Sequence, residues 1–177
     1  LANSLGMLIA GPNGQGVVST PASLCLQIVA PYPPQGGISV ASQSGNFVSS
    51  FLNYSRQSGV GIARAISAGN ATQISVENFL DFFASDVETK VALTYIENVG
   101  DGQSLLKSMK NITAVKPLVV LKGGATAAGS KAAQSHTGAM ASNDRVFFGA
   151  TRSCGAIKVS SVEEAFDTAA TFATQPL

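Results

Sequence analysis

Hydrophobic and polar positions follow two alternating patterns along most of the chain. Short runs rich in β-branched residues are each followed by a segment whose apolar residues recur every three or four positions, which is the spacing of an amphipathic helix. The predicted strands are Ile38–Ala41, Gly61–Ser67, Lys90–Ile96, Pro117–Leu121 and Ala156–Val159. The predicted helices are Gly45–Gln57, Ser75–Ala84, Gln103–Thr113, Asn143–Ser153 and Val162–Ala173. This alternation predicts βαβ units and a parallel sheet.

Five parallel strands with helices on both faces predict a flavodoxin-like, doubly wound α/β fold with three layers, α/β/α. The expected strand order is 2-1-3-4-5. In such a sheet the ligand binds beyond the carboxyl ends of the strands, at the switch point between the first and the third strand. The residues that follow each strand are therefore the candidates for function.

The first 37 residues follow a different pattern. Two apolar stretches, Met7–Ala10 and Leu24–Ala30, flank a glycine-rich turn over Gly11–Gly16. Residues 31–37 contain three prolines and two glycines. Because proline fixes φ and donates no backbone hydrogen bond, this segment predicts a linker or domain boundary.

Composition narrows the class of protein. The chain has 177 residues, of which 45% are hydrophobic and 12% charged, against about 25% charged in an average domain. A net charge of +1 excludes the clustered basic surface of a nucleic-acid-binding protein. No apolar run approaches the roughly 20 residues that span a bilayer, so no membrane contact is expected.

The termini and cysteines predict the compartment. The chain begins without Met and without a signal-peptide pattern, so we expect a piece of a cytoplasmic protein. Cys25 and Cys154 have no spacing typical of a metal site or disulfide framework, and we expect both to be reduced and buried.

Small and glycine residues follow the predicted strands. These segments are Ser42-Gln43-Ser44-Gly45-Asn46, Ser67-Ala68-Gly69-Asn70, Lys122-Gly123-Gly124-Ala125-Thr126 and Ser135-His136-Thr137-Gly138-Ala139. Small residues let backbone N–H groups approach an anion, and a helix N-terminus adds free donors and a favourable dipole. The sequence therefore predicts a phosphate site at this edge.

Two side chains could supply chemistry there. His136 is the only histidine, and its imidazole could act as a general base, a metal ligand or a phosphate-accepting nucleophile, or it could be structural. Metal binding is the weakest of these because no second ligand has the right spacing. Glu97 ends a predicted strand and could be solvated, cap a helix or orient His136 through one ring nitrogen, which would leave the other free to attack phosphorus.

Three other motifs are excluded because the chain lacks residues that they require. Ser42-Gln43-Ser44-Gly45 lacks the first glycine of the G-x-S-x-G nucleophile elbow. The turn over Gly11–Gly16 is not a dinucleotide-binding G-x-G-x-x-G, and Lys122-Gly123-Gly124 is not a Walker A motif.

These motifs, taken in order, resemble the NDP-forming acyl-CoA synthetases, relatives of the succinyl-CoA synthetase alpha subunit. The resemblance rests on the Gly-Pro-Asn turn at residues 11–13, the four glycine-rich segments above and Tyr95-Ile96-Glu97. It implies that residues 1–30 are the C-terminal tail of a CoA-binding, Rossmann-like domain. Residues 31–37 would be a linker, and residues 38–177 a succinyl-CoA ligase-like flavodoxin domain.

The family resemblance implies a relay. Acyl-CoA, phosphate and NDP interconvert with carboxylic acid, CoA and NTP through an acyl phosphate and a phosphohistidine, His136, which Glu97 would steady. Phosphate contacts would come from Gln43, Ser44, Gly45, Asn46, Gly69, Asn70, Gly123, Gly124, Thr126, Ser135, Thr137 and Gly138, with no metal ligand. The implied cofactors are CoA and phosphate here, and ATP/ADP or GTP/GDP with Mg²⁺ at a separate ATP-grasp unit. The implied partners are an upstream CoA-binding domain and the ATP-grasp domain or subunit, in an oligomeric, cytoplasmic enzyme whose isolated fragment would be inactive.

Two departures and two alternatives accompany the resemblance. Family members often carry Cys-Leu where this chain has Gly14-Gln15, and Arg where it has Ala125. One alternative is a non-catalytic regulatory domain that senses acyl-CoA or nucleotide, as in acetyltransferase fusions; another is an interaction domain without a ligand. His136 and Glu97 favour the ligase.

Overall fold

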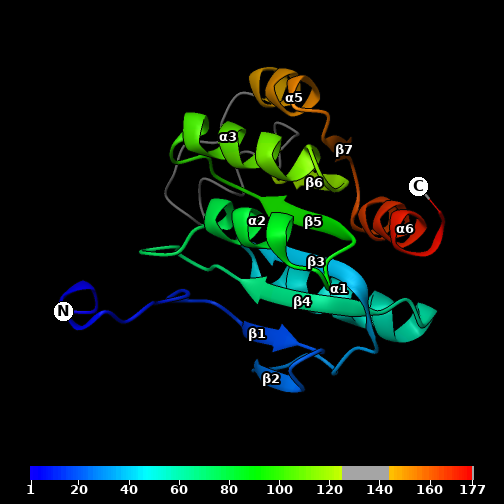
Figure 1. Ribbon diagram of the computed structural model, residues 1–177, viewed down its shortest axis with the longest axis horizontal. Coiled ribbons are helices and arrows are strands. Elements are labelled where there is room, and N and C mark those ends of the chain that lie inside the picture. Colours follow the sequence, from blue (N-terminus) through cyan, green and yellow to red (C-terminus); the bar gives the residue numbers. More distant parts are fainter. Residues whose placement is uncertain (125–143, 177) are drawn as a thin grey trace.

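A single mixed sheet forms the centre of the fold (Figure 1). The structure is a computed structural model that describes residues 1–124 and 144–176. The strands are β1 (Gly16–Ser19), β2 (Leu24–Gln27), β3 (Gln35–Ser42), β4 (Ile62–Ser67), β5 (Val91–Ile96), β6 (Leu118–Lys122) and β7 (Ile157–Val159). Their order across the sheet is β2-β1-β4-β3-β5-β6-β7.

The five parallel strands have the predicted order. β3 pairs in parallel with both β4 and β5, and the sheet continues through β6 to β7. Counted among the parallel strands, this is 2-1-3-4-5, so the switch point lies between β3 and β5. The predicted fold class is therefore confirmed.

The predicted number of five strands was wrong, because the described sheet has seven. β1 and β2 form an antiparallel hairpin, and β1 also pairs antiparallel with β4, Val17 opposite Ile66. Strands of four residues carry little periodicity, and β1 is held in the sheet by β4, a partner far along the chain. The assignment of residues 1–30 to a CoA-binding domain stays a prediction.

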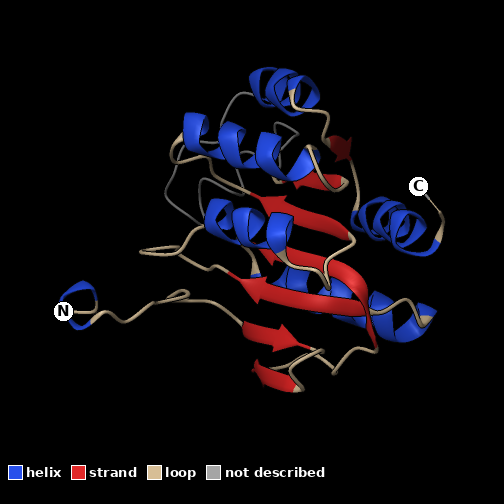
Figure 2. Cartoon of the chain, viewed as in Figure 1, coloured by secondary structure: helices blue, strands red, loops and turns tan. Residues whose placement is uncertain are grey.

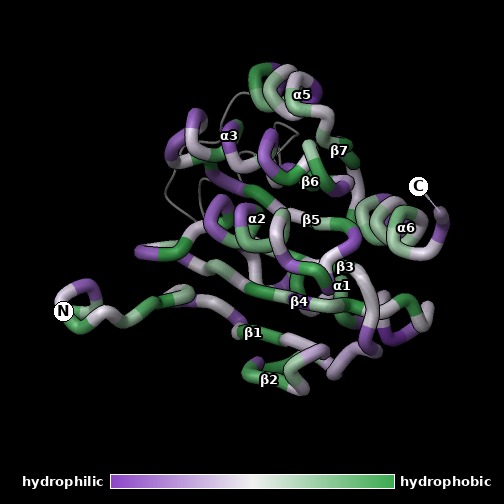
Figure 3. Tube along the Cα trace, viewed as in Figure 1, coloured by the Kyte–Doolittle hydropathy of each residue, from purple (hydrophilic) through white to green (hydrophobic). Residues whose placement is uncertain are grey.

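Helices cover both faces of the sheet (Figure 2). One face carries α1 (Gly45–Ser58) and α6 (Val162–Thr174); the other carries α2 (Val76–Ser85), α3 (Gly102–Thr113) and α5 (Asp144–Ser153). Hydrophobic and hydrophilic residues alternate along these helices (Figure 3), so each turns one apolar stripe to the sheet. Phe51 and Phe166 fill the first core and Leu80 and Phe83 the second, all fully buried.

Side-chain caps begin three of the helices. Asp101 accepts hydrogen bonds from the first turn of α3, Ser75 and Asn78 form a capping box on α2, and Ser161 caps α6. Ser44, at the N-cap of α1, makes no such bond with its side chain. The backbone N–H groups in the first turn of α1 therefore donate no hydrogen bond to the Ser44 side chain.

A buried ionic network closes the amino edge of the sheet. Arg64 donates to Asp86 at 3.1 Å and to the Ser19 hydroxyl. The other carboxylate oxygen of Asp86 accepts from Thr89 at 2.8 Å, and Thr89 lies 2.7 Å from the hydroxyl of Ser39. These bonds join β1, β3 and β4 to the turn before β5.

Three sequence expectations can be compared with this fold. Cys154 is buried, but Cys25 is exposed on β2, because β2 is the edge strand of the sheet. None of the helices in the described ranges is long and apolar enough to cross a membrane. Within those ranges, no three His, Cys, Asp or Glu side chains form a metal-binding group.

Candidate functional site

The carboxyl ends of β3, β4, β5 and β6 bring several predicted site residues together. Ser42 at the end of β3 lies opposite Ser67 of β4 and Tyr95 of β5. The next residues along these strands include Gln43 and Glu97, which contact each other through the backbone of Glu97. The predicted edge is therefore formed by residues from four separate parts of the chain.

Gln43 holds the loop that carries Glu97. Its side-chain oxygen accepts from the backbone N–H of Glu97 at 2.7 Å and of Asn98 at 2.9 Å. Its side-chain nitrogen donates to the Asn98 carbonyl at 2.8 Å. Its own backbone N–H donates to the carbonyl of Tyr95 at 3.1 Å. The side chain of Gln43 therefore positions the loop, and a phosphate contact would be a second role of this residue.

Glu97 lies in a compact group with Tyr95 and Gly123. Tyr95 is 7% exposed, and its ring stacks on Phe47 of α1 with a centroid distance of 3.7 Å. Burial raises the pKa of Tyr95 well above its ordinary value, and the Glu97 charge and a hydrogen bond to its carboxylate raise it further. A Cβ on Gly123 would lie 2.5 Å from the Tyr95 hydroxyl and 3.2 Å from Glu97 Cγ, so only glycine fits there.

Lys122 was not predicted as a site residue, yet it is buried at the end of β6. Its ammonium donates to the Gly123 carbonyl at 2.7 Å and the Glu97 carbonyl at 3.3 Å. Burial lowers the pKa of Lys122, while the charges of Asp144 and Glu97 oppose that shift. The sequence signal was a lysine directly after a predicted apolar strand, in one of the segments predicted to form the phosphate edge.

The glycine-rich turn over Gly11–Gly16 is also part of this edge. The carbonyl of Pro12 accepts from the backbone of Asn70 at 2.9 Å, and Asn13 donates to the Asn70 side chain at 3.2 Å. A Cβ on Gly69 would lie 2.6 Å from the carbonyl carbon of Asn13. The predicted residues Gly69 and Asn70 are therefore interlocked with a turn that the sequence placed in another domain.

Gln15 connects this turn to the start of α1. It is 8% exposed, and a Cβ on Gly45 would lie 2.9 Å from its Cβ. The hydroxyl of Ser49 donates to its side-chain oxygen at 2.7 Å. Among the described residues, three buried side-chain polar atoms have no partner, and Gln15 Nε2 and Ser67 Oγ are two of them.

The arrangement can bind an anion. An N-terminus without a side-chain cap offers backbone donors and the positive end of a helix dipole, worth about 0.3–1 kcal/mol for a nearby anion. Gly45 and Asn46 begin the first turn of α1, and Ser44 occupies the N-cap position before them. Gly123 and Gly124 follow β6. Thr126, Ser135, His136, Thr137 and Gly138 lie outside the described residues.

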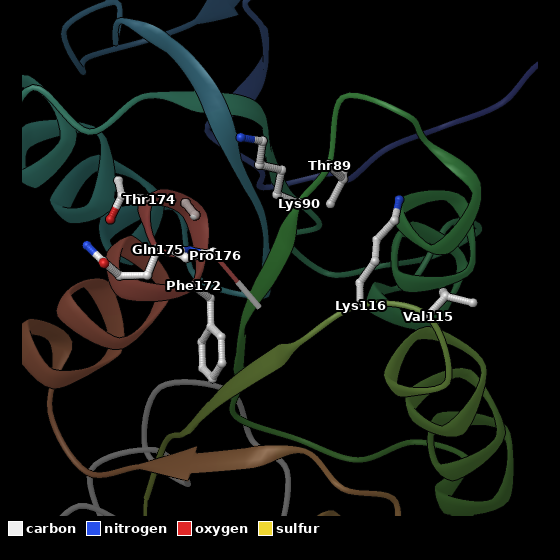
Figure 4. Close-up of a pocket in the computed structure, with 9 residues that line it drawn as sticks. Thr89, Lys90, Val115, Lys116, Phe172, Thr174, Gln175 and Pro176 are labelled. Carbon is white, nitrogen blue, oxygen red and sulfur yellow. The ribbon is translucent and has the colours of Figure 1, made fainter.

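Two cavities among the described residues lie away from this edge. One of about 500 Å³ is at the amino edge, where Lys90 and Lys116 precede β5 and β6 and Phe172 of α6 forms a wall (Figure 4). A second, of about 670 Å³, lies over β1, β4 and α2, between Leu8 and Phe82. Neither is lined by a predicted site residue.

The sequence profile of the succinyl-CoA ligase-like flavodoxin domain matches residues 35–172. The chain is 37% identical to the ADP-forming acetate–CoA ligase I of Archaeoglobus fulgidus, over 94% of this chain and 24% of that enzyme. It is 36% identical to the ADP-forming 4-hydroxybutyrate–CoA ligase of Nitrosopumilus maritimus, over 100% of this chain and 26% of that enzyme.

A solved structure shows the same fold. The dinucleotide forming acetyl-coenzyme A synthetase 1 of Ca. Korarchaeum cryptofilum, in complex with phosphate and ADP, superposes with a TM-score of 0.93 at 31% identity. The match covers 99% of this chain and 38% of that one. This chain thus spans 24% to 38% of the length of these relatives. It belongs to the succinyl-CoA ligase-like flavodoxin domains of the NDP-forming acyl-CoA synthetases.

Proposed function

We propose that this chain is the CoA-ligase domain of an NDP-forming acyl-CoA synthetase. It would interconvert acyl-CoA, NDP and phosphate with carboxylic acid, CoA and NTP. The observation that carries the proposal is the match of 94% to 100% of this chain to ADP-forming CoA ligases. These relatives do not favour the alternative of a non-catalytic sensing domain.

The phosphate would bind at the start of α1. Ser44, Gly45 and Asn46 offer backbone donors there, and Gly69, Asn70, Gly123 and Gly124 come from the neighbouring strand ends. Because a phosphoryl group carries about −1.5 to −2 charges, uncapped donors and a helix dipole stabilise it. Gln43 would keep the Glu97 loop at the correct distance from this group.

The proposed reaction has three transfers. A phosphate oxygen attacks the thioester carbonyl, the carbon–sulfur bond breaks, and CoA leaves as the thiol with one proton. A ring nitrogen of His136 then attacks the phosphorus of the acyl phosphate, and the carboxylate leaves. The phosphoryl group finally passes to a terminal oxygen of NDP, which restores the neutral histidine. The carboxylate of Glu97 would orient the imidazole throughout.

The rest of the enzyme would supply what this chain lacks. An upstream CoA-binding domain would hold the thioester, and an ATP-grasp domain or subunit would bind the nucleotide with Mg²⁺. The relatives support this division because each is much longer than this chain. We propose an oligomeric, cytoplasmic enzyme, in which Ser135, Thr137, Gly138 and Thr126 also contact the phosphoryl group.

The proposal is tested on the full-length protein with Mg²⁺ and NTP labelled at the γ-phosphate. We expect one protein-bound phosphate that is lost in acid and kept in base, and that CoA and a carboxylic acid discharge. The His136→Ala variant should carry none, whereas Glu97→Gln should be labelled more slowly by at least about tenfold. Label that persists in His136→Ala would refute the phosphohistidine.

A further inference from the structure

The hydroxyl of Tyr95 lies beside the side chain of Glu97. A Cβ placed on Gly123 would touch the Tyr95 hydroxyl and Glu97 Cγ together, so the two side chains meet over the backbone of the loop after β6. The ring of Tyr95 cannot move freely, because it is buried and stacks on Phe47 with planes 14° apart. A fixed ring places its hydroxyl at a fixed point.

Glu97 is held by its backbone from both sides as well. Gln43, which follows β3, accepts from its N–H, and Lys122 of β6 donates to its carbonyl. These contacts place the main chain of Glu97 but do not set the direction of its carboxylate. Among the described residues, Tyr95 brings its hydroxyl beside the Glu97 side chain: a Cβ on Gly123 would lie 2.5 Å from that hydroxyl and 3.2 Å from Glu97 Cγ.

We propose that Tyr95 is a positioning residue of this site, whose hydroxyl holds one oxygen of the Glu97 carboxylate and so aims the other. The proposal rests on the function proposed above, in which that carboxylate orients a reacting group. A carboxylate has two oxygens and accepts several bonds, so one oxygen can be fixed while the other serves the reaction.

The charges around the pair agree with this role. Burial and the neighbouring carboxylate raise the pKa of Tyr95, so its hydroxyl keeps its proton and remains a donor throughout the physiological range. On β6, Lys122 is the other described titratable group whose charge interacts with Glu97. Its ammonium bonds to backbone carbonyls, so it fixes the loop rather than the carboxylate.

The chain contains a matched control. Tyr54 of α1 also stacks on a phenylalanine, Phe166, with a centroid distance of 5.7 Å. Its hydroxyl also donates to a glutamate, Glu163, at 3.2 Å. This second pair joins α1 to α6 and has no contact with the candidate site. Tyr54→Phe thus removes a tyrosine hydroxyl beside a glutamate, as Tyr95→Phe does, but away from the candidate site.

The kinetic test compares Tyr95→Phe with Tyr54→Phe in the full-length enzyme. Both substitutions keep the stacked ring. We expect Tyr95→Phe to lower kcat about tenfold and to change KM for CoA and carboxylic acid less than twofold, because the misdirected carboxylate slows the reaction without altering binding. Tyr54→Phe should match the wild type. Equal kcat in the two variants, or a parallel rise of KM in Tyr95→Phe, would overturn the proposal.

A second measurement does not depend on activity. The full-length protein is labelled with ¹³C at tyrosine Cζ, and the signal missing from Tyr95→Phe identifies Tyr95. At neutral pH we expect the Tyr95 signal to move in Glu97→Gln, because the variant replaces the charged partner of the hydroxyl, and the signal of Tyr54 to stay in place. An unchanged Tyr95 signal would overturn the proposal. An enzyme without NDP-dependent activity would refute the proposed function, while this measurement would still decide the contact.

Discussion

The two edges of the sheet differ in how completely their buried polar groups are hydrogen-bonded. At the amino edge, Arg64, Asp86, Thr89 and Ser39 bond to one another in an unbroken series. At the carboxyl edge, Gln15 and Ser67 each have a buried polar atom without a partner among the residues that the structure describes, and Ser44 does not cap α1 with its side chain. The same parallel strands form both edges, one with their amino ends and the other with their carboxyl ends.

The difference shows where stability and function reside. A buried donor without a partner costs about 1–3 kcal/mol, so a fold keeps few of them. The amino edge avoids that cost, and it joins four elements. At the carboxyl edge, the atoms of Gln15 and Ser67 without a partner destabilise the fold, and they lie where the proposed phosphate would need free donors. Substitutions should therefore affect stability most at the amino edge and activity most at the carboxyl edge.

The largest loss of stability is expected from Asp86→Ala. The variant leaves the Arg64 guanidinium, whose side chain is 17% exposed, without its carboxylate and removes the acceptor for Thr89. Breaking such a pair costs about 3–5 kcal/mol. Urea unfolding measures the change. Asp144→Ala, which breaks the more exposed pair with Lys158, should cost at most about 1 kcal/mol. Equal losses at the two pairs would contradict the distinction.

The pH dependence of unfolding checks the same pair. Burial alone would raise the pKa of Asp86, but bonds from Thr89 and Arg64 outweigh it and leave the pKa below its ordinary value. A lowered folded-state pKa stabilises the fold above the unfolded value, about 3.9, and this contribution disappears as the pH falls through the folded value. Wild-type stability should therefore decline below about pH 4, and Asp86→Ala should lack this part of the decline.

Much of the fold could be predicted because its core strands are short and almost wholly apolar. β5 and β6 are buried at every position, and β5 is followed by α3, a helix with a clear apolar stripe. β1 and β2 could not be predicted in the same way. β1 pairs with β4, about 50 residues away in sequence, while β2 pairs, among the described strands, only with β1 and is mostly exposed.

The candidate site was predicted in part for a related reason. The carboxyl ends of parallel strands meet at one edge, so the approach of Gln43 to Glu97 follows from the topology. Tyr95 has apolar neighbours and was predicted only as part of a strand, and Lys122 was predicted only as part of the segment that follows one. Their polar atoms meet Glu97 and Gly123, which follow β5 and β6, and a periodic pattern does not contain these contacts.

The next largest effect is expected from Gly69→Ala at the carboxyl edge. Gly69 has a φ of 55°, and its Cβ would meet the backbone of Pro12 and Asn13. We expect a loss of about 2–3 kcal/mol, from left-handed strain of about 1–2 kcal/mol and displacement of the turn. Gly59→Ala is the control that separates the backbone strain from the displacement of the turn. Gly59 has a φ of 76° with nothing within 4 Å, so only the strain should appear. If the two variants unfold alike in urea, the turn and the loop are not interlocked.

The smallest effect on stability is expected from Gln15→Leu. Leucine keeps the apolar contact with Gly45 and removes the side-chain nitrogen that has no partner. It also removes the acceptor of Ser49, a hydroxyl that is only partly buried and can bond to water. These terms nearly cancel, so the free energy of unfolding should stay within about 1 kcal/mol of the wild type.

Gln43→Leu is the matched control, because it makes the same change at a residue of the same edge. Gln43 uses its amide for bonds to Glu97 and Asn98, so its loss should cost about 2 kcal/mol in the same urea experiment. Both variants should lower phosphate-dependent activity of the full-length enzyme, and Gln15→Leu should do so by raising KM for phosphate, because it removes a donor that the anion would use. A loss of stability in Gln15→Leu as large as that in Gln43→Leu would show that Gln15 is a structural anchor. Gln15 would then stabilise the carboxyl edge as Asp86 stabilises the amino edge, and the contrast between the edges would fail at this residue.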